Sequence, residues 1–288
     1  MNFVIVGAFM DILACPLCAH RLFLSGKTLK CENGHSFDIA REGYVNLSLS
    51  GKRKTRISGD GRDMVLSRRA FLKNGHYAPL LHEIASVIIS RCKNGRISHP
   101  VIIDAGCGEG YYTNNIKALV DQDGFFASVF GFDLSKDAVK MASKGSACTF
   151  AAANIFHLPV SPCCADFVLS VFSPVAESEF LRIVKPGGVL IIVSPGRRHL
   201  FEMKEALYSD PYENDDAAWE IPGFATLTKK TCLFKMHLSG SDDIINLFKM
   251  TPYSFRTAKG GEAALGALSS LDITAEFEIS ALVKNNLV

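Results

Sequence analysis

Val101-Ile-Ile-Asp104-Ala-Gly106-Cys-Gly108-Glu-Gly110 is the stretch of sequence that decides the fold. Its three β-branched residues predict a short strand that is buried on both faces, with Asp104 at its end. Gly106, Gly108 and Gly110 lack Cβ atoms, so the backbone can turn tightly here and approach a ligand closely with its N–H groups. The stretch therefore predicts a strand, then a ligand-binding loop, then a helix.

Short apolar runs continue to alternate with helix-length segments after this stretch. Runs bounded by Gly, Pro and Asp predict strands, and their repetition with helices indicates a Rossmann-like, doubly wound α/β sheet. In such a sheet, ligands bind at the carboxyl ends of the strands. The later strands are predicted at 128–133, 148–152, 166–172 and 189–193, and the helices at about 112–120, 136–143 and 177–184.

Two regions flank the predicted sheet. Residues 67–90 have a helical pattern that we expect to be broken at Gly75 and Pro79. Near the C-terminus, the runs around 226–228 and 273–279 predict antiparallel strands at the edge of the sheet.

The glycine spacing separates two classes of cofactor. A dinucleotide-binding loop requires Gly-x-Gly-x-x-Gly, and Tyr111 occupies the place of its last glycine. Gly-x-Gly-x-Gly after an Asp instead resembles the first motif of the S-adenosylmethionine-dependent methyltransferases. Asp133, at the end of the second predicted strand, lies where a carboxylate can accept both ribose hydroxyls. A nicotinamide enzyme and a glycine turn without ligand are the alternatives.

A metal-binding pattern precedes the sheet. Cys15-Pro-Leu-Cys18 is followed by Cys31 after twelve residues and by His35 after three more. Three thiolates and one imidazole at this spacing predict a closed, tetrahedral zinc site. A disulfide framework is the alternative, but Met1–Met10 is too short for a signal peptide, so we expect a reducing, cytoplasmic location. A segment this short buries too little surface to fold alone, so zinc would stabilise it.

Composition and charge narrow the class of protein. The 288 residues are 48% hydrophobic and 21% charged, which is typical of a globular protein with a large core. No apolar run is long enough to span a membrane. The stretch 52–73 is strongly basic, and beside a zinc segment it predicts a phosphate-binding surface. A solvated linker would explain the charge equally well. The basic residues are Lys52, Arg53, Lys54, Arg56, Arg62, Arg68, Arg69 and Lys73.

Seven stretches carry a closer likeness: Cys15–Cys18, Glu42–Leu47, Arg68–Leu72, Gly75–Tyr77, Asp104–Thr113, Val184–Gly188 and Pro195–Leu200. In this order they resemble the 23S ribosomal RNA (guanine-N1) methyltransferases of the zinc-knuckle type, which include the tylosin and related macrolide resistance methyltransferases. The resemblance covers nearly the whole chain. Residues 1–9 fall outside it, as an upstream start codon would explain.

The resemblance implies a reaction, a partner and two sites. The reaction is methyl transfer from S-adenosylmethionine to N1 of a guanine in a 23S ribosomal RNA hairpin, and zinc is held by the Cys and His residues named above. Tyr77, Gly108, Glu109 and His199 match cofactor-site positions of the family, and Asn154 stands where relatives place an Asp or Ser beside the adenine. The full set expected to bind the cofactor is Tyr77, Asp104, Gly106, Gly108, Glu109, Gly110, Asp133, Asn154 and His199.

We expect three parts along the chain: a zinc-binding RNA-recognition domain over 10–50, a basic arm and connecting helix over 51–80, and a methyltransferase domain over 81–288. No catalytic base is identified. The loop 170–177, which faces the cofactor methyl in this architecture, contains Ser173-Pro174 rather than the Asn/Asp-Pro-Pro-Tyr of amino-group methylases. Glu177 is its only strong base and opens the next helix, so it is left unassigned.

Two other functions stay open at this point. A small-molecule methyltransferase of the quinone type has similar sheet motifs, but it has no need of a zinc segment or a basic arm. A non-catalytic, zinc-dependent RNA-binding protein would have no need of an intact glycine loop and Asp133. The sequence also leaves open which guanine is modified, whether the chain forms a homodimer, and whether methylation confers antibiotic resistance.

Overall fold

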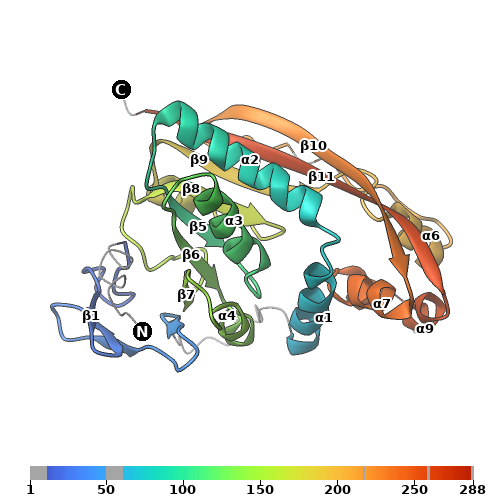
Figure 1. The fold of residues 1–288 in the computed structure, drawn as a ribbon, viewed down its shortest axis with the longest axis horizontal. Coiled ribbons are helices and arrows are strands. Elements are labelled where there is room, and N and C mark those ends of the chain that lie inside the picture. The colour runs from blue at the N-terminus through green and yellow to red at the C-terminus, as the bar shows by residue number, and fades with distance from the viewer. Residues whose placement is uncertain (1–11, 50–60, 217, 258–259, 287–288) are drawn as a thin grey trace.

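The computed structural model describes residues 12–49, 61–216, 218–257 and 260–286. Its centre is one eight-stranded sheet with the order β10-β11-β9-β8-β5-β6-β7-β4 (Figure 1). The five predicted strands of the parallel part are confirmed. β9 begins earlier than predicted because Val184 already pairs with Ala165 of β8, ahead of an irregularity in the register. These strands are β5 (Val101–Ala105), β6 (Ser128–Asp133), β7 (Thr149–Ala152), β8 (Ala165–Val171) and β9 (Val184–Pro195).

The strand order reverses at β5. β6 and β7 follow on one side of it, whereas β8 and β9 lie on the other. A crevice opens at the carboxyl ends of the strands on either side of such a reversal, and this is where ligands bind in α/β sheets. The chain thus places the glycine loop, which follows β5, at the centre of that edge.

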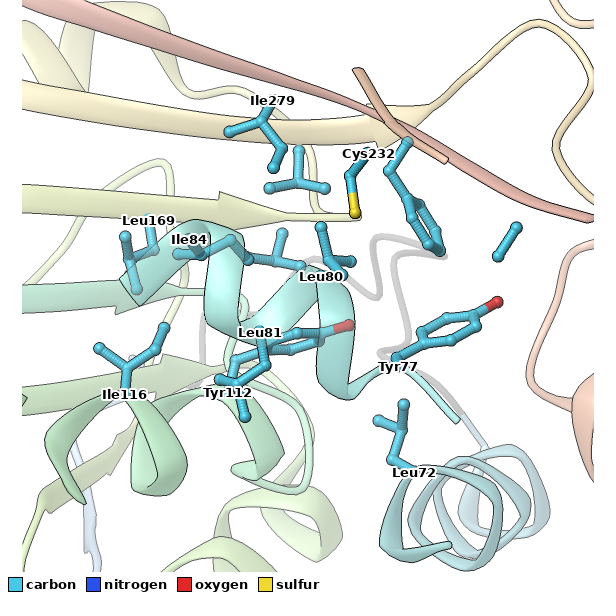
Figure 2. Packing of buried hydrophobic residues seen from close by; sticks show 14 of the residues in the cluster. Leu72, Tyr77, Leu80, Leu81, Ile84, Tyr112, Ile116, Leu169, Cys232 and Ile279 are labelled. Carbon is cyan, nitrogen blue, oxygen red and sulfur yellow. The ribbon is translucent and has the colours of Figure 1, made fainter. Parts of the chain in front are cut away.

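The central strands are covered on both faces. Ile102 packs into the core on one side of the sheet, and Ile103 packs into the core on the other. Figure 2 shows the first of these cores, to which Leu80 and Ile84 of α2 (Ala78–Gly95) and Leu169 of β8 belong. The helices that follow the parallel strands are α3 (Tyr111–Gln122), α4 (Lys136–Ala142) and α5 (Glu177–Ile183).

The helical region before the sheet is broken once. α1 (Arg62–Lys73) ends before Gly75, whose φ of +80° turns the chain into α2. The predicted break at Pro79 is wrong, because Pro79 lies in the first turn of α2. The N–H that proline lacks would have no partner there, so the residue is well tolerated.

Two long antiparallel strands complete the sheet, β10 (Phe224–Ser239) and β11 (Ser270–Lys284). Of these two strands, β10 lies at the edge of the sheet. The prediction that both lie at the edge is wrong for β11, which pairs with β9 on one side and with β10 on the other. Its buried apolar residues, Phe277 and Ile279 among them, require this enclosed position.

The far end of the β10–β11 pair carries small helices (Figure 1). One of them is joined to the α1–α2 corner, because Asp243 accepts hydrogen bonds from Asn74 Nδ2 at 2.8 Å and from His76 Nε2 at 2.9 Å. The chain at the end of α1 is thereby fastened to α7. The helices of this end are α6 (Phe201–Leu207), α7 (Ser241–Lys249), α8 (Tyr253–Arg256) and α9 (Gly261–Gly266).

The N-terminal segment is docked onto the sheet. Leu13 forms an antiparallel bridge with Val160, and the N–H of Leu47 donates to the carbonyl oxygen of Ala152 at 2.9 Å. Leu13 is fully buried in the core that also contains Phe130. The zinc segment therefore shares a core with the sheet. Its strands are β1 (Phe23–Ser25), β2 (Thr28–Lys30), β3 (Ser36–Asp38) and β4 (Val45–Asn46), of which β4 pairs with β7.

No helix in the described part of the chain is long and apolar enough to cross a membrane.

Candidate functional site

Four ligand atoms converge in the N-terminal segment. The donor atoms of Cys15, Cys18, Cys31 and His35 all lie within 4.8 Å of one another. Cys18 Sγ is 3.7 Å from Cys31 Sγ, and His35 Nδ1 is 3.4 Å from Cys31 Sγ. Zinc–sulfur bonds of about 2.3 Å in a tetrahedron place two sulfurs about 3.8 Å apart. The donor set and its spacing therefore fit one tetrahedral zinc ion.

Two tight turns present these ligands. The N–H of Cys15 donates to the carbonyl oxygen of His20 at 2.7 Å, and the N–H of Cys31 donates to that of His35 at 3.0 Å. A hydrogen bond from the backbone N–H of His20 lowers the pKa of the Cys18 thiol to about 5. Burial has the opposite effect on Cys15, whose pKa is raised. Cys18 is thus more readily present than Cys15 as the thiolate that zinc binds.

A large cavity lies at the carboxyl edge of the sheet. Its volume is about 1710 Å³, well above the roughly 300–1,000 Å³ of a pocket for one small ligand. The glycine loop, the zinc turn at 14–19, α1 and the stretch between α6 and β10 all contribute to its wall. The cavity has room for a cofactor and for part of a second reactant.

The three glycines of the loop are required for different reasons. A Cβ at Gly106 would lie 2.5 Å from Ser173 Cβ, and a Cβ at Gly110 would lie 2.7 Å from Ala142 Cβ. At Gly108 the nearest atom would be Arg68 Nη1 at 3.5 Å, so a side chain here would project into the cavity. Gly106 and Gly110 permit close packing, whereas Gly108 keeps space open for a ligand.

Asp133 links the loop to the neighbouring helix. Its Oδ2 accepts the N–H of Gly108 at 3.0 Å, and its Oδ1 accepts the N–H of Ser135 at 2.8 Å. These bonds hold the carboxylate at the cavity wall, next to the glycine loop.

Asp104 lies behind the wall. Its side chain is buried, and its Oδ2 accepts the hydroxyl of Thr113 at 2.6 Å. Burial raises the pKa of Asp104 to about 7. Neither Asp104 nor Gly110 lines the cavity, whereas the other residues expected to bind the cofactor do. Asp104 braces the strand end against α3.

Glu109 faces the cavity from the glycine loop. Its side chain is mostly buried, and its Oε2 accepts the N–H of Tyr111 at 3.0 Å. Burial raises the pKa of Glu109 to about 7, and the nearby Arg68 opposes that rise. The carboxyl is therefore divided between its neutral and charged forms at neutral pH.

Tyr77 and His199 meet across one aromatic cluster. The ring of Phe277 lies 4.9 Å from that of Tyr77 and 4.5 Å from that of His199. The backbone N–H of Glu276 donates to His199 Nδ1 at 3.3 Å, and burial lowers the pKa of His199 to about 3. The ring is neutral at pH 7 and carries its proton on Nε2. Figure 2 shows Tyr77 just before α2.

Asn154 follows β7 and also lines the cavity. Its Oδ1 accepts the N–H of Phe156 at 3.0 Å, which fixes the turn after the strand. The structure therefore brings Asn154 and His199, 45 positions apart in the chain, to the wall of the same cavity.

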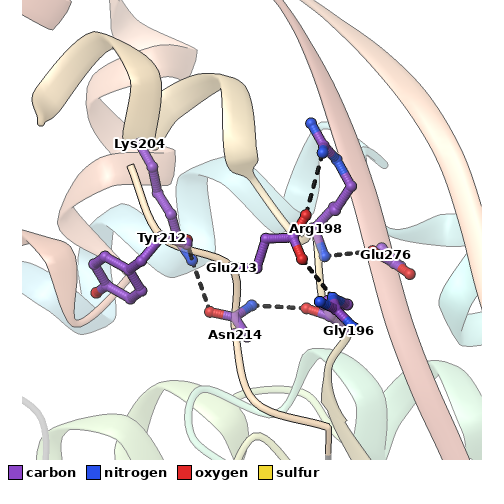
Figure 3. A network of polar contacts seen from close by, with 8 residues as sticks. Gly196, Arg198, Lys204, Tyr212, Glu213, Asn214 and Glu276 are labelled. Atoms are coloured by element: carbon purple, nitrogen blue, oxygen red, sulfur yellow. Dashed lines mark hydrogen bonds and ion pairs between the residues drawn. The ribbon is translucent and has the colours of Figure 1, made fainter. Parts of the chain in front are cut away.

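Sequence reasoning missed the stretch between α6 and β10, which also lines the cavity. Figure 3 shows how it is held. The fully buried Lys204 donates from Nζ to the carbonyl oxygen of Tyr212 and to Asn214 Oδ1, both at 2.8 Å. Asn214 Nδ2 donates to the carbonyl oxygen of Gly196 at 2.7 Å. Lys204 stands between Glu202 and Glu205 in α6, so no local pattern marked it as buried, and its acceptors come from elsewhere in the fold.

Other cavity residues were not singled out either, although Phe172 belongs to the loop 170–177 that we expected to face the cofactor methyl. Arg68 reaches the wall from α1, Leu17 reaches it from the turn between two zinc ligands, and Phe172 follows β8. Trp219, the single tryptophan of the chain, lines the cavity as well. Its lone occurrence in a polar stretch was the only sign of it in the sequence.

Comparisons with known proteins cover both parts of the chain. A family model described as "RlmA, N-terminal", a zinc ribbon, matches residues 13–54, and one described as a methyltransferase domain matches residues 98–246. A Bacillus subtilis protein assigned provisionally as a 23S rRNA (guanine-N1) methyltransferase is 34% identical over 276 residues, which are 93% of this chain and 96% of that protein.

Two further relatives match a shorter part of the chain. The 23S rRNA (guanine(748)-N1) methyltransferase of Streptomyces fradiae is 38% identical over 198 residues, 68% of this chain and 67% of its own length. A Micromonospora griseorubida protein, provisionally assigned the same type of activity, is 32% identical over 211 residues, 68% of this chain and 69% of its own.

Proposed function

The chain belongs to the family of 23S ribosomal RNA (guanine-N1) methyltransferases, and from that premise we propose which residues bind the cofactor and which bind RNA. The reaction is transfer of a methyl group from S-adenosylmethionine to N1 of a guanine in 23S ribosomal RNA. The observation that carries the assignment is that the zinc turn and the glycine loop line the same cavity. A quinone-type methyltransferase gives no reason for a zinc turn in that wall.

The cofactor is held along the glycine loop. The cofactor would lie against the backbone of this loop, in the open space at Gly108. The carboxylate of Asp133 would accept hydrogen bonds from the ribose hydroxyls of the cofactor. Asn154 lies at the adenine end. Tyr77, Glu109 and the neutral His199 lie at the methionine end, and Asp104, Gly106 and Gly110 hold the loop in shape. S-adenosylmethionine supplies an electrophilic methyl group on a sulfonium ion.

The chemistry rests on positioning. Guanine N1 carries a proton and becomes nucleophilic as that proton leaves. Transfer from a sulfonium ion neutralises charge, so a dry cavity that aligns N1 with the methyl group contributes much of the rate. Among the described residues we assign no general base.

Zinc stabilises the segment that recognises RNA. We place the recognition domain at 10–50, the basic arm with its connecting helix at 51–80 and the methyltransferase domain at 81–288. Lys52, Arg53, Lys54 and Arg56 lie outside the described residues. Of the remaining basic residues, Arg62, Arg69 and Lys73 are exposed on α1, and Arg68 lines the cavity.

The partner is a 23S ribosomal RNA hairpin. Its stem would present phosphates to the basic residues, and its loop would present a guanine that leaves its stack and enters the cavity. We place the reaction in the cytoplasm, where ribosomal RNA is found. A homodimer stays a prediction that sedimentation of the purified protein would test.

Primer extension tests this function. A methyl group on N1 blocks the Watson–Crick edge of guanine, so reverse transcriptase stops there. We expect such a stop on 23S RNA from cells that carry the gene and no stop when the gene is deleted. Labelled methyl groups found in a lipid extract, with none in RNA, would favour the quinone-type alternative. Absence of S-adenosylmethionine binding would favour the non-catalytic one.

A further inference from the structure

Phe172 has an unusual backbone conformation beside the glycine loop. It directly follows β8, the strand next to β5, and lies in the cavity wall. Its φ is +54°, in the left-handed region that bulky L-residues rarely adopt. Such conformations persist only where the surrounding structure imposes them, and they concentrate at functional sites.

Several hydrogen bonds impose this conformation. The N–H of Phe172 donates to the carbonyl oxygen of Val193 at 3.1 Å. Ser173 Oγ donates to the carbonyl oxygen of Ala105 at 2.6 Å and lies 2.9 Å from Ser170 Oγ. Ser173 also fills the space left by Gly106. The turn that carries Phe172 is therefore fastened to the end of β5 and to the start of the glycine loop.

The ring of Phe172 is supported but not covered. It lies 5.4 Å from the ring of Phe277 and 6.4 Å from that of Tyr112, both of which are buried. Phe172 itself is 45% exposed, and it lines the cavity. A large apolar ring is thus presented to a ligand space from a rigid base.

We propose that Phe172 is the platform on which the target guanine stacks, next to the cofactor loop. The proposal rests on the proposed function and names the subsite for its second reactant. An unstacked base loses its neighbours in RNA, and an aromatic side chain replaces them with a contact of similar geometry. Stacking leaves the edge of the guanine free, so N1 stays accessible to the methyl group.

Other exposed aromatic residues of the wall are less suited to this task. Phe156 is equally exposed, at 45%, but follows Asn154 at the adenine end. Tyr212 is 46% exposed, and its ring lies 4.3 Å from the ammonium of Lys204. Only Phe172 of these three directly follows β8, beside the strand that carries the glycine loop.

The test compares three variants of the full-length protein. Phe172→Tyr keeps an aromatic ring. Phe172→Asn removes it, and Asn tolerates a positive φ, so the backbone strain is relieved. Phe126→Ala is the control, because Phe126 is 70% exposed, stacks on His99 and lies outside the cavity wall. The substrates are unmodified 23S ribosomal RNA transcribed in vitro and tritiated S-adenosylmethionine, and calorimetry measures cofactor affinity without RNA.

We expect Phe172→Asn to lower the methylation rate at saturating RNA about ten- to a hundredfold, the loss typical for a stacked base. Phosphate contacts supply most RNA affinity, so KM for RNA should change little. Phe172→Tyr and Phe126→Ala should stay within about threefold of the wild type, and cofactor affinity and melting temperature should be nearly unchanged in every variant.

Two results would overturn the proposal. One is a Phe172→Asn protein that methylates RNA at the wild-type rate. The other is a Phe172→Asn protein that loses cofactor affinity or folding together with activity, since the ring would then serve the fold or the cofactor. Methylation by the wild-type protein separates either result from a failure of the proposed function. If the proposed function were wrong, the wild-type protein itself would not methylate 23S RNA.

Discussion

At the scale of single residues, an added Cβ at Gly108 should lower cofactor affinity more than it lowers the stability of the fold. Its Cβ would enter the cavity, whereas a Cβ at Gly106 would clash with Ser173. We expect Gly108→Ala to weaken S-adenosylmethionine binding about tenfold or more. The positive φ of +53° should cost about 1 kcal/mol of stability. Calorimetry measures the affinity, and thermal melting measures the stability.

Gly106→Ala is the matched comparison for this prediction. The clash at 2.5 Å should lower the melting temperature of Gly106→Ala more than that of Gly108→Ala. If Gly108→Ala bound the cofactor as tightly as the wild type, the cofactor would not approach this part of the loop.

The raised pKa of Asp104 should make the free energy of unfolding depend on pH. Its ordinary pKa is 3.8, and burial raises the pKa in the folded protein to about 7. The folded state therefore holds a proton that the unfolded state releases, so stability falls as pH rises from about 4 to about 7. Asp104→Asn should remove this dependence, which is worth up to about 1.4 kcal/mol per pH unit.

Urea unfolding at several pH values between 4.5 and 7.5 measures the difference between the two proteins. Glu109 has a raised pKa as well and is present in both proteins. Asp104 adds to that rise, so its removal weakens the pH dependence from Glu109 in the same direction. Parallel stability curves for the wild type and Asp104→Asn would show that Asp104 is charged throughout.

At the scale of elements, the zinc segment has two roles in the structure. It docks on the sheet through Leu13 and Leu47, and its metal-binding turn contributes Leu17 to the cavity wall. Loss of the metal should therefore unfold the segment and remove one wall of the RNA-binding region, while the glycine loop stays formed.

Cys18→Ala tests this division. We expect about one zinc per wild-type chain by mass spectrometry of the metal content and none in the variant. Methylation of 23S RNA should fall at least about a hundredfold, because an unfolded segment cannot position RNA, whereas calorimetry should find nearly unchanged cofactor affinity. Normal methylation by the zinc-free protein would remove the segment from RNA recognition.

At the scale of the whole molecule, charge is unevenly distributed although the net charge is only +2. Arg62, Arg69 and Lys73 are exposed on α1, the helix that also sends Arg68 into the cavity wall. Phosphate contacts release counterions, so each contact steepens the dependence of RNA affinity on salt by about 0.7–0.9 in log–log slope. Replacing these three residues with Ser should flatten that slope by about 2–3 and weaken RNA binding at moderate salt.

A control with the same loss of charge distinguishes local contacts from net charge. Lys229, Lys230 and Lys235 are exposed on the edge strand β10, and none of them lines the cavity. Either triple substitution changes the net charge from +2 to 2 − 3 = −1. Filter binding at several salt concentrations should find a flatter slope for the α1 variant than for the β10 variant. Equal slopes would place the RNA elsewhere.

The spacing of residues along the chain determined the glycine loop, the zinc site and the parallel sheet. The glycine loop after β5 and the zinc ligands each depend on a turn of a few residues or on one hairpin, so their positions in the sequence predict their positions in space. The alternation of strands and helices likewise predicted the parallel sheet. The break at Gly75 was predicted for the same reason, since a positive φ is a local property.

The tertiary structure alone decided how the cavity wall is assembled. Lys204 is buried because Tyr212 and Asn214 supply its acceptors, and the position of Phe172 depends on Val193 and Ala105. β11 is internal because it pairs with strands on both sides. These contacts join residues far apart in sequence, and they form only when the core excludes water from all of them together. No short stretch of the sequence contains both partners of such a contact, so hydrophobic periodicity cannot predict these contacts.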